Sequence, residues 1–420
     1  MEEKAVAVIG AGVIGCAVAC ALAQCGQRVV LFDRHDPGTA GASYGNVGHI
    51  AAELVQPLPS PGLLFGFWRE LFLLDGPLDI PPGRLGALAP WAWRFARAAF
   101  RRAENTRQLA PLVKPAVSDF ARLLGSIGRP DLLRRNGHFQ VWFGRNAARR
   151  AAAEAASMRV LGVPTEPAPP DLLDTLARGA AQSSAAGLGF PDSGHVVDPL
   201  EIAQVLVAAA VQRGARFERN DVRTLLPTGD AIELTTPAGR REFATVVVCA
   251  GPWSAHLLAP FGLHAPLEPA YGYHVELQAH EPQVQAPLIY MDQKVLVTPM
   301  RGRLRASSYM EFSGSDSAPD PRKPVALRRK LRALGYRCEP AGPSWRGARP
   351  VLPDYLPGIG RAPGSQRLFY AIGHQHIGLT LAPVTGELVA DIVCGRQPRH
   401  PLDAFDLRRF GPPPRSSGAA

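Results

Sequence analysis

The 420-residue sequence predicts an α/β fold whose second lobe is of the α+β type. Apolar runs rich in β-branched residues at 5–9 and 28–32 flank a stretch of glycine and alanine, as expected for a strand, a helix and a second parallel strand. A similar buried run returns at 245–251. The runs 271–277, 295–299 and 304–309 predict strands of an antiparallel sheet. A chain of this length can hold two or three domains.

A glycine-rich turn follows the first predicted strand. Gly10, Gly12 and Gly15 have the spacing GxGxxG, with Val13 and Ile14 between the last two. In this spacing the first glycine permits a tight turn and the second lets backbone N–H groups approach a pyrophosphate. The third lets the next helix pack close to the strand. The phosphates would then lie at the positive N-terminus of that helix.

A carboxylate ends the second predicted strand. Asp33 stands where an acidic side chain accepts hydrogen bonds from the ribose hydroxyls of a dinucleotide, and Arg34 follows it as a further candidate. Strand, glycines, helix, strand and carboxylate in this order predict a Rossmann-like dinucleotide site. A signal peptide is the alternative for so apolar a beginning, but Met1-Glu2-Glu3-Lys4 is not a basic leader, so none is expected.

Composition narrows the class of protein. The formal net charge is +10, yet the arginines are scattered and do not alternate with aromatic residues, so nucleic-acid binding is not predicted. No long run of apolar residues predicts a transmembrane span. The six cysteines form no CxxC pair and no His/Cys cluster of metal-ligand spacing, so no metal site is predicted. Reduced, mostly buried thiols in a cytoplasmic protein are expected.

A basic amphipathic helix is predicted over 88–107, after proline-rich stretches at 57–62 and 77–83. Trp91 and Phe95 lie on its apolar face, and Arg94, Arg97 and Arg101 share another face. One interpretation is peripheral contact with the anionic inner face of the cell membrane. The alternative is an ordinary outer helix of the second lobe.

Two further motifs lie far along the chain. The stretch 345–354 leads into 357–360, and 370–383 reads YAIGHQHIGLTLAP. Together with the N-terminal glycines and the turn Ser43-Tyr44-Gly45-Asn46, these motifs resemble the glycine oxidase and D-amino-acid dehydrogenase (DAO) family of FAD-dependent enzymes, which includes D-proline and 4-hydroxy-D-proline dehydrogenases. The resemblance covers nearly the whole chain.

This resemblance implies two lobes built from separated segments. The FAD-binding domain is expected at 1–60, 195–262 and 345–410, and the substrate domain, with its antiparallel sheet and flanking helices, at 61–194 and 263–344. A tail over 411–420, rich in Pro, Ser and Gly, is expected to be disordered. The FAD is expected to be bound non-covalently.

The resemblance also implies the reaction. A hydride would pass from the α-carbon of an amino acid, most readily a D-amino acid and including cyclic D-proline or 4-hydroxy-D-proline, to flavin N5, giving an imino acid. A quinone, a dye or oxygen would be the electron acceptor. Glycine, sarcosine or another secondary amine is the alternative substrate, and an NAD-linked dehydrogenase or a non-catalytic FAD-binding subunit is the alternative class. A homo- or hetero-oligomer is compatible with each of these.

The candidate site residues follow from the same motifs. Arg349 matches the arginine that holds the substrate carboxylate in these enzymes, and a planar guanidinium suits that role; Arg346 is its competitor. Tyr271, Tyr273 and His274 match a segment that lines the substrate side of the flavin, and His374 precedes the flavin-facing helix. The remaining cofactor candidates come from small-residue strand ends and turns: Ser43, Asn46, Val222, Ala250, Gly251, Gly373, Gly378, Leu379 and Thr380.

Overall fold

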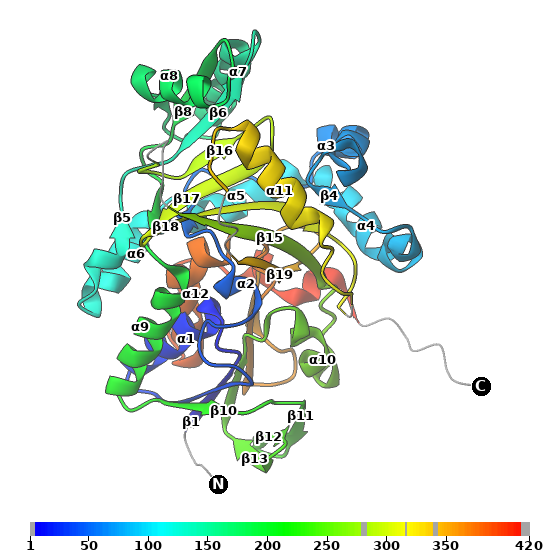
Figure 1. The fold of residues 1–420 in the computed structure, drawn as a ribbon. Coiled ribbons are helices and arrows are strands. Elements are labelled where there is room, and N and C mark those ends of the chain that lie inside the picture. The colour runs from blue at the N-terminus through cyan, green and yellow to red at the C-terminus, as the bar shows by residue number, and fades with distance from the viewer. Residues whose placement is uncertain (1–4, 279–283, 316, 339–342, 413–420) are drawn as a thin grey trace.

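The N-terminal strand lies near the centre of a six-stranded sheet in the computed structural model of this protein (Figure 1). The structure describes residues 5–278, 284–315, 317–338 and 343–412. All neighbouring strands are parallel except the last pair. Their spatial order is β10 (Arg216–Arg219), β2 (Arg28–Asp33), β1 (Ala5–Ile9), β14 (Thr245–Val248), β21 (Leu368–Ile372) and β20 (Gly358–Arg361). Three distant segments thus form one Rossmann-like sheet, which confirms the predicted fold class.

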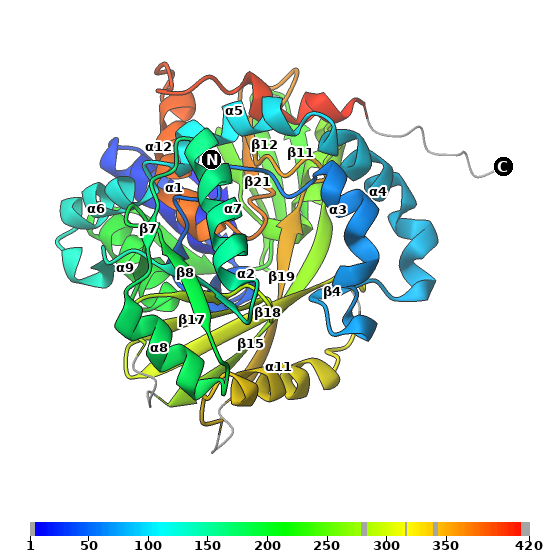
Figure 2. The same ribbon diagram turned by 90° about the horizontal axis from the view of Figure 1, so that it is seen from above.

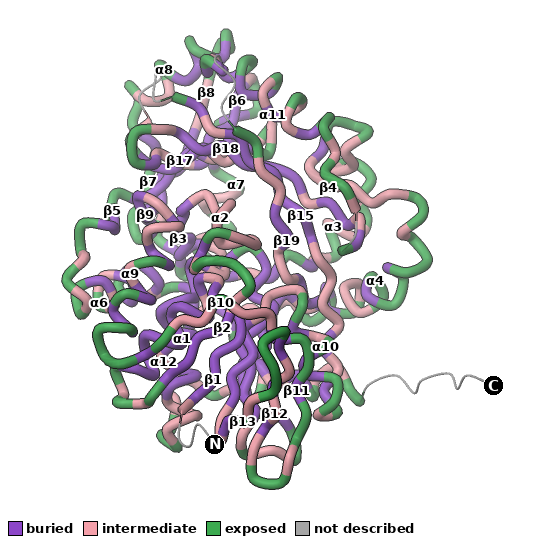
Figure 3. The backbone as a smooth tube through the Cα atoms, turned by 60° about the horizontal axis from the view of Figure 1, so that its bottom comes forward, coloured by how far each residue is buried: buried purple, intermediate pink, exposed green. Residues whose placement is uncertain are grey.

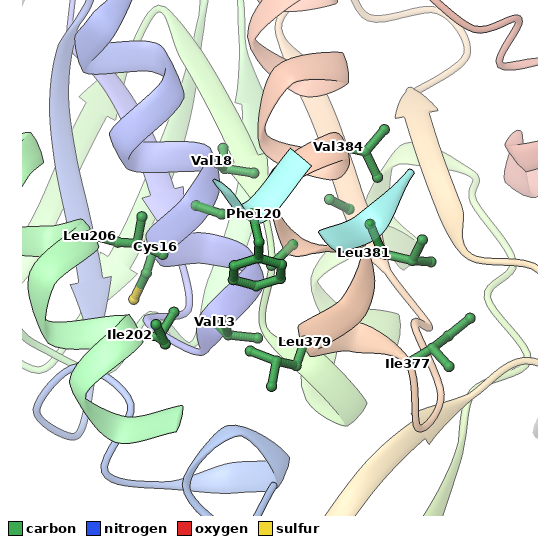
Figure 4. Packing of buried hydrophobic residues seen from close by; sticks show 14 of the residues in the cluster. Val13, Cys16, Val18, Phe120, Ile202, Leu206, Ile377, Leu379, Leu381 and Val384 are labelled. Atoms are coloured by element: carbon green, nitrogen blue, oxygen red, sulfur yellow. The ribbon is translucent and has the colours of Figure 1, made fainter. Parts of the chain in front are cut away.

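Three helices cover one face of this sheet. Helix α1 (Val13–Gln24) lies between α9 (Pro199–Gln212) and α12 (Gly378–Val393), and their apolar side chains meet in one buried cluster (Figure 4). Small residues allow the close approach. A Cβ on Gly386 would lie 2.7 Å from the carbonyl oxygen of Ala17, so α12 packs directly on the backbone of α1.

The other face carries a small antiparallel sheet. It consists of β11 (Thr224–Thr228), β12 (Ala231–Thr236) and β13 (Gly239–Phe243), and Phe243 packs edge-on against Phe32 of β2 with the ring centres 5.7 Å apart. Helix α10 (Ser254–Leu258) and the 3-10 helix η6 (Ala259–Phe261) contact β11, and η5 (Gly251–Trp253) packs on α10. The 3-10 helices η7 (Asp403–Phe405) and η8 (Leu407–Phe410) lie beside β20.

A nine-stranded mixed sheet forms the second lobe (Figures 1 and 2). Its spatial order is β19 (Ser344–Val351), β15 (Glu268–Gln278), β18 (Arg303–Glu311), β17 (Val295–Met300), β16 (Leu288–Tyr290), β6 (Phe139–Phe143), β8 (Ala185–Gly189) and β7 (Glu166–Pro167), with β4 (Leu78–Asp79) paired to β18. Helix α11 (Arg322–Ala333) packs on β15 and β18, whereas α7 (Ala147–Val160) and α8 (Pro170–Gly179) pack on β8.

A third antiparallel sheet consists of β3 (His49–Ile50), β9 (Gly194–Val196) and β5 (Leu133–Arg134). The remaining elements surround the two lobes. They are α2 (Gly41–Tyr44), α3 (Pro61–Gly66), η1 (Phe67–Glu70), η2 (Phe72–Leu74), η3 (Pro82–Arg84), α4 (Leu85–Ala99), α5 (Arg102–Val113), α6 (Ala116–Ser126) and η4 (Pro130–Leu132). The central strands are buried and the outer helices partly exposed (Figure 3).

Three expectations differ from the observed fold. The helix predicted over 88–107 is two helices, α4 and α5, because the chain turns at Phe100 and Arg101. The proposed boundaries assign β19 to the FAD domain and α6 to the substrate domain. In the structure β19 pairs with β15 of the large sheet, and α6 packs on α12, with Phe120 in the buried cluster of the Rossmann-like lobe (Figure 4).

Two other expectations concern the membrane and the tail. None of the helices in the described part of the chain has both the length and the apolar character needed to cross a bilayer. Of the tail expected to be disordered, 413–420 lies outside the described residues.

Candidate active site

A large cavity of about 1340 Å³ runs from the glycine turn after β1 to the inner face of the nine-stranded sheet. Its walls come from both lobes: the ends of β1 and β2, the turn before β3, the N-terminus of α12, and parts of β15, β18 and β19. The carboxyl ends of parallel strands are where open α/β sheets bind ligands. The cavity exceeds the roughly 300–1,000 Å³ of ordinary small-molecule sites, so it has room for a dinucleotide together with a second molecule.

In the turn after β1 the backbone segments approach so closely that a side chain on the glycines would collide with them. Gly10 has φ +104°, and a Cβ there would lie 2.4 Å from the carbonyl oxygen of Cys249. A Cβ on Gly15 would lie 1.8 Å from the carbonyl oxygen of Gly10. The backbone N–H of Val13 at the start of α1 donates to Ser43 Oγ over 2.9 Å. The turn thus leads tightly into the N-terminus of α1, and the positive end of a helix dipole favours a phosphate there.

The Asp33 carboxylate is held at the other side of this turn. Its Oδ2 accepts from the N–H of Ala11 over 2.7 Å, and its Oδ1 accepts from the N–H of His35 over 2.8 Å. The guanidinium of Arg34 stacks over the ring of Trp253 at 4.4 Å. Asp33, Arg34 and Trp253 line the cavity, as do four other predicted residues at this end: Ile14, Val222, Ala250 and Gly251. These residues form the end of the cavity that suits a nucleoside.

The N-terminus of α12 forms the opposite part of the wall. Gly378, Leu379 and Thr380 line the cavity there, and Thr380 Oγ1 accepts from the N–H of Ala51 over 3.1 Å. His374 also lines the cavity, but its Nε2 lies 3.0 Å from Thr385 Oγ1, so one ring nitrogen is already engaged within the protein. Burial lowers the pKa of His374 to about 3, which keeps the ring neutral.

Unusual backbone conformations gather around the cavity. Six described residues other than glycine have a positive φ, and four of them line it: Lys294, Tyr309, Tyr355 and Gln375. Such conformations cost about 1–3 kcal/mol each and persist where the surrounding fold imposes them, which is typical of functional sites. The strained backbone therefore lies around the same cavity as the residues of the sequence motifs.

Arg349 lies on the cavity face of β19. Its Nη1 donates to the carbonyl oxygen of Tyr309 over 3.0 Å, and its guanidinium lies against Gly272 of β15. No carboxylate within the described ranges forms an ion pair with it. Burial lowers the pKa of Arg349, against a smaller opposing effect of Tyr355. A buried guanidinium without an acidic partner is suited to bind an incoming carboxylate.

Arg346 is engaged elsewhere. Its Nη2 donates to Glu311 Oε1 over 2.9 Å, and its guanidinium stacks on the Tyr271 ring at 3.4 Å. Side chains alternate between the two faces of a strand. Arg349 shares its face with Trp345 and Gly347, all three lining the cavity, and Arg346 belongs to the opposite face. This alternation distinguishes the two arginines that the sequence left as competitors.

The structure does not bring Tyr271, Tyr273 and His274 into the cavity wall. The hydroxyl groups of Tyr271 and Tyr273 donate to the Ser315 carbonyl and to Glu311, over 3.1 and 2.8 Å. His274 stacks on Trp345, and its Nδ1 lies 3.1 Å from the Gly45 carbonyl oxygen. These three side chains support the sheet and the turn before β3.

Tyr309 and Tyr355 lie nearer to Arg349, and neither was predicted from the sequence. Both line the cavity, and the Tyr309 carbonyl oxygen accepts from Arg349. The Tyr309 ring itself packs edge-on against Phe72, with Lys330 Nζ of α11 5.7 Å from its centre. Tyr309 belongs to an ordinary-looking alternating strand. Its position depends on φ +72°, a local reversal that alternation does not reveal.

The cavity fits an FAD molecule by its shape and its donors. One end has a glycine turn in which Cβ atoms would collide with backbone, together with an oriented carboxylate. The other end has backbone donors at the start of α12 and lies beside an arginine. Of the predicted cofactor residues, Gly10, Gly12, Val13, Ser43, Asn46 and Gly373 also line the cavity, whereas Gly15 supports the turn from behind.

Comparisons with known proteins agree with this geometry. A family model described as FAD dependent oxidoreductase (DAO) matches residues 5–392. A D-amino-acid oxidase of Bradyrhizobium diazoefficiens is 31% identical over 423 residues, covering 97% of this chain and 99% of that protein. A D-amino acid dehydrogenase of Paramagnetospirillum magneticum is 31% identical over 422 residues, covering 96% and 98%. The crystal structure of glycine oxidase from Geobacillus kaustophilus has the same fold, with a TM-score of 0.77, 24% identity and coverage of 97% and 99%.

The Rossmann-like lobe and its cavity therefore define an FAD-dependent oxidoreductase. The chain belongs to the DAO family, whose model covers most of its length. The family, the enzymatic class and the FAD cofactor predicted from the sequence are thereby confirmed.

Proposed function

We propose that this enzyme oxidises a D-amino acid at its Cα–N bond to an imino acid, which water hydrolyses to a 2-oxo acid. Cyclic imino acids such as D-proline and 4-hydroxy-D-proline belong to the same proposal and would give a pyrroline carboxylate. The relatives named D-amino-acid oxidase and D-amino acid dehydrogenase support this substrate class. The observation that carries the proposal is the Arg349 guanidinium, which borders the cavity without a carboxylate partner among the residues the structure describes.

The chain has to bind, orient and shield the substrate. Non-covalently bound FAD supplies the hydride acceptor. Arg349 would bind the substrate carboxylate through two parallel N–H donors. Apolar side chains such as Leu296 and Met291 cover other parts of the wall and exclude water. Holding the α-carbon in one orientation is the main contribution that the protein makes to a cofactor reaction.

The acidic residues of the cavity wall lie away from Arg349. Within the described chain they are Asp33, Asp36 and Asp221 at the nucleoside end and Glu70 on η1. Among the residues that the structure describes, no carboxylate beside Arg349 is therefore placed to act as a strong general base. This arrangement supports oxidation of an amine that enters in its neutral form.

The test compares Arg349→Ala with the wild-type enzyme. Loss of a hydrogen-bonded charge contact costs about 1.5–3 kcal/mol, so the KM for the D-amino acid should rise by about 10- to 150-fold while the FAD content is unchanged. The purified protein should be yellow and should bleach anaerobically with the substrate. An unchanged KM would remove the carboxylate-binding role of Arg349. Bound FAD without turnover on any amine would instead favour the non-catalytic subunit.

The substrate panel should include D-, L- and N-alkyl amino acids, glycine and sarcosine. Preference for glycine or sarcosine would favour the alternative secondary-amine or glycine oxidase. Peroxide release measured beside dye reduction separates an oxidase from a dehydrogenase. Peroxide formation without dye reduction would show that oxygen is the acceptor.

We also propose that the enzyme contacts an anionic membrane surface. Within the described chain, nine of the fourteen exposed large apolar side chains lie between Leu58 and Phe100. They include Phe65 and Leu73, which are 80% and 86% exposed. Their elements, α3 to α4, lie side by side at one flank of the molecule (Figures 1 and 2). So many exposed apolar side chains on neighbouring elements are typical of interaction surfaces.

The exposed apolar surface is not the face of the helix that was predicted over 88–107. The apolar stripe of Trp91 and Phe95 packs inward, stacked ring on ring at 5.3 Å and against Phe312 and Tyr355. Five of the nine exposed side chains belong to α3, η1 and η2. Leu85 and Trp93 belong to α4, and Leu58 and Phe100 lie just outside these elements. Because Leu63, Phe67 and Leu85 of these elements also line the cavity, a lipid-soluble quinone could reach the flavin from this flank.

A further inference from the structure

A second polar cluster lies outside the machinery proposed for oxidation. His49 of β3, Glu53 of the following turn and His138 just before β6 are all buried, with exposures of 8%, 2% and 0%. His49 Nε2 lies 3.8 Å from Glu53 Oε1, and His138 Nε2 lies 3.6 Å from the same oxygen. The three ligand-type atoms lie within 4.8 Å of one another.

The atoms that face each other lack hydrogen bonds. Among the described residues, His49 Nε2, Glu53 Oε1 and His138 Nε2 have no hydrogen-bond partner. The distances between them are too long for direct hydrogen bonds. An unpaired polar atom in the interior costs free energy, and here three such atoms point at one small volume. They therefore require a common partner at its centre.

A cation suits this volume. Two imidazole nitrogens and one carboxylate oxygen converge on it, and each of these atoms can give a lone pair to a metal ion. The ion-pair contacts of Glu53 among the described residues are with the two histidines, so no lysine or arginine of that part of the chain supplies positive charge there.

The backbone around the cluster is held tightly. Gly48 has φ +73°, and a Cβ there would lie 2.8 Å from the carbonyl oxygen of Val196. Gly137 has φ +68°, and its Cβ would lie 2.9 Å from the carbonyl oxygen of Phe190. Each glycine directly precedes one of the histidines, so the two imidazoles are presented from backbone with little freedom to move apart.

The hydroxyl of Ser193 orients the Glu53 carboxylate. Ser193 Oγ donates to Glu53 Oε2 over 2.7 Å, which leaves Oε1 turned toward the histidines. Hydrogen bonds of this kind to metal-ligating carboxylates fix their orientation in metalloproteins. The His138 ring is also stacked on Phe190, with the ring centres 4.5 Å apart.

We propose that His49 Nε2, Glu53 Oε1 and His138 Nε2 bind a divalent transition-metal cation of the zinc type. Two imidazoles and one carboxylate are a known zinc ligand set, with ligand distances near 2.0–2.1 Å. In a tetrahedron these distances separate neighbouring ligand atoms by about 3.3 Å. The two histidine–glutamate gaps, 3.8 and 3.6 Å, therefore need to close by only a few tenths of an ångström. The fourth position is left for water.

The ion would link segments that are distant in the sequence. His49 begins β3 of the small third sheet, whereas His138 leads into β6 of the large sheet. His49 also lines the cavity, which gives the ion a path of entry. A cation here would fix the cavity wall beside β3 to the second lobe and would stabilise the folded chain. The histidines and glutamate meet only in the fold, so their spacing in the sequence gave no metal signal.

The test measures metal content in untagged, full-length FAD-loaded protein. After incubation with Zn²⁺ and dialysis, the wild type should retain about one Zn²⁺ per chain, and Zn²⁺ should raise its melting temperature. Glu53→Gln and His138→Asn should retain none. The control His264→Asn changes a half-buried histidine outside the cluster and should bind Zn²⁺ as the wild type does.

A milder variant covers the case in which these substitutions prevent folding. Ser193→Ala removes only the hydrogen bond to Glu53 and should weaken Zn²⁺ binding by about 10- to 100-fold in a folded protein. Wild-type protein that retains no Zn²⁺ would show that only water fills the site and would overturn the proposal. Equal Zn²⁺ content in the wild type and in folded Glu53→Gln, or equal Zn²⁺ affinity in the wild type and in Ser193→Ala, would also overturn it. These readouts do not depend on amino-acid oxidation.

Discussion

The Arg349 guanidinium lies so close to Gly272 that a methyl group there would stand 2.0 Å from its Nη2 atom. Gly272 occupies an irregularity of β15, where the register with β18 shifts between Tyr271 and Tyr273. The bulge and the missing side chain together make the space in which the guanidinium faces the cavity. Substrate binding thus depends on a residue with no functional group of its own.

Gly272→Ala should therefore act like a mutation of Arg349. The new methyl group would displace the guanidinium, and we expect the KM for the D-amino acid to rise at least tenfold, since a misplaced charged hydrogen bond costs about 1.5–3 kcal/mol. FAD content should stay normal. Gly125→Ala in α6, where a Cβ meets open space, is the matched control. Steady-state kinetics would contradict the argument if Gly272→Ala kept the wild-type KM.

A second prediction concerns Asp33 at the nucleotide end of the cavity. Asp33 accepts two backbone N–H groups, from Ala11 and His35. The asparagine of Asp33→Asn has one acceptor oxygen, so one N–H would face an amide NH₂. We expect FAD to dissociate about 10- to 100-fold more readily, measured by recovery of free-flavin fluorescence. Asp174→Asn changes an exposed carboxylate of α8 that does not line the cavity, and it is the control. Equal FAD affinity in both variants would show that Asp33 does not organise this end.

The nucleotide end and the substrate end of the cavity differ in how far the sequence predicted their residues. The glycine turn and Asp33 are local: their roles follow from spacing within one strand–helix–strand unit, and the structure places them on the cavity as expected. The resemblance favoured Arg349 over Arg346 by its position in the motif, and the register of β19 supplies the physical reason, since the two arginines lie on opposite faces of that strand. Tyr309 and the cluster of His49, Glu53 and His138 depend on strand pairing and a local backbone reversal, which periodicity does not encode.

Acid stability should depend on the buried Glu311. Burial raises its pKa, but hydrogen bonds from Lys323, Ser313 and Tyr273 outweigh that effect and hold the pKa below its ordinary value. Below about pH 4.3 the unfolded chain binds a proton at this position that the folded chain does not. The free energy of unfolding should therefore fall as the pH drops from about 5 toward the lower pKa of the folded state.

Lys323→Met tests this linkage. Removing one partner from a buried ion pair costs about 3–5 kcal/mol, so stability at pH 7 should fall by that amount, measured by urea unfolding. The loss of stability below pH 5 should become shallower, because the pKa of Glu311 is lowered less once the Lys323 ammonium is gone. Lys330→Met is the matched control: this buried lysine donates to the backbone carbonyls of Asp75 and Gln293. An equally shallow acid dependence in the control would exclude the Glu311–Lys323 pair as its source.

Membrane contact should depend on the exposed aromatic side chains of α3 and η1. Phe65 is 80% exposed and Trp68 is 49% exposed, with Arg69 beside them in the chain. Apolar side chains enter the bilayer interface while arginine attracts anionic headgroups. The wild type should therefore sediment with vesicles that contain anionic phospholipid and remain in solution with neutral vesicles.

The double variant Phe65→Ser/Trp68→Ser should lose most of this binding, since each apolar side chain contributes about 1.5–3 kcal/mol when fully buried. Its dye-linked activity in solution should be unchanged, because neither side chain lines the cavity. Val160→Ser, at an exposed apolar residue of α7, is the control and should bind vesicles as the wild type does. If the double variant and the wild type sediment equally, the flank formed by α3 to α4 does not hold the enzyme at the membrane, and a quinone would have to reach the cavity from solution.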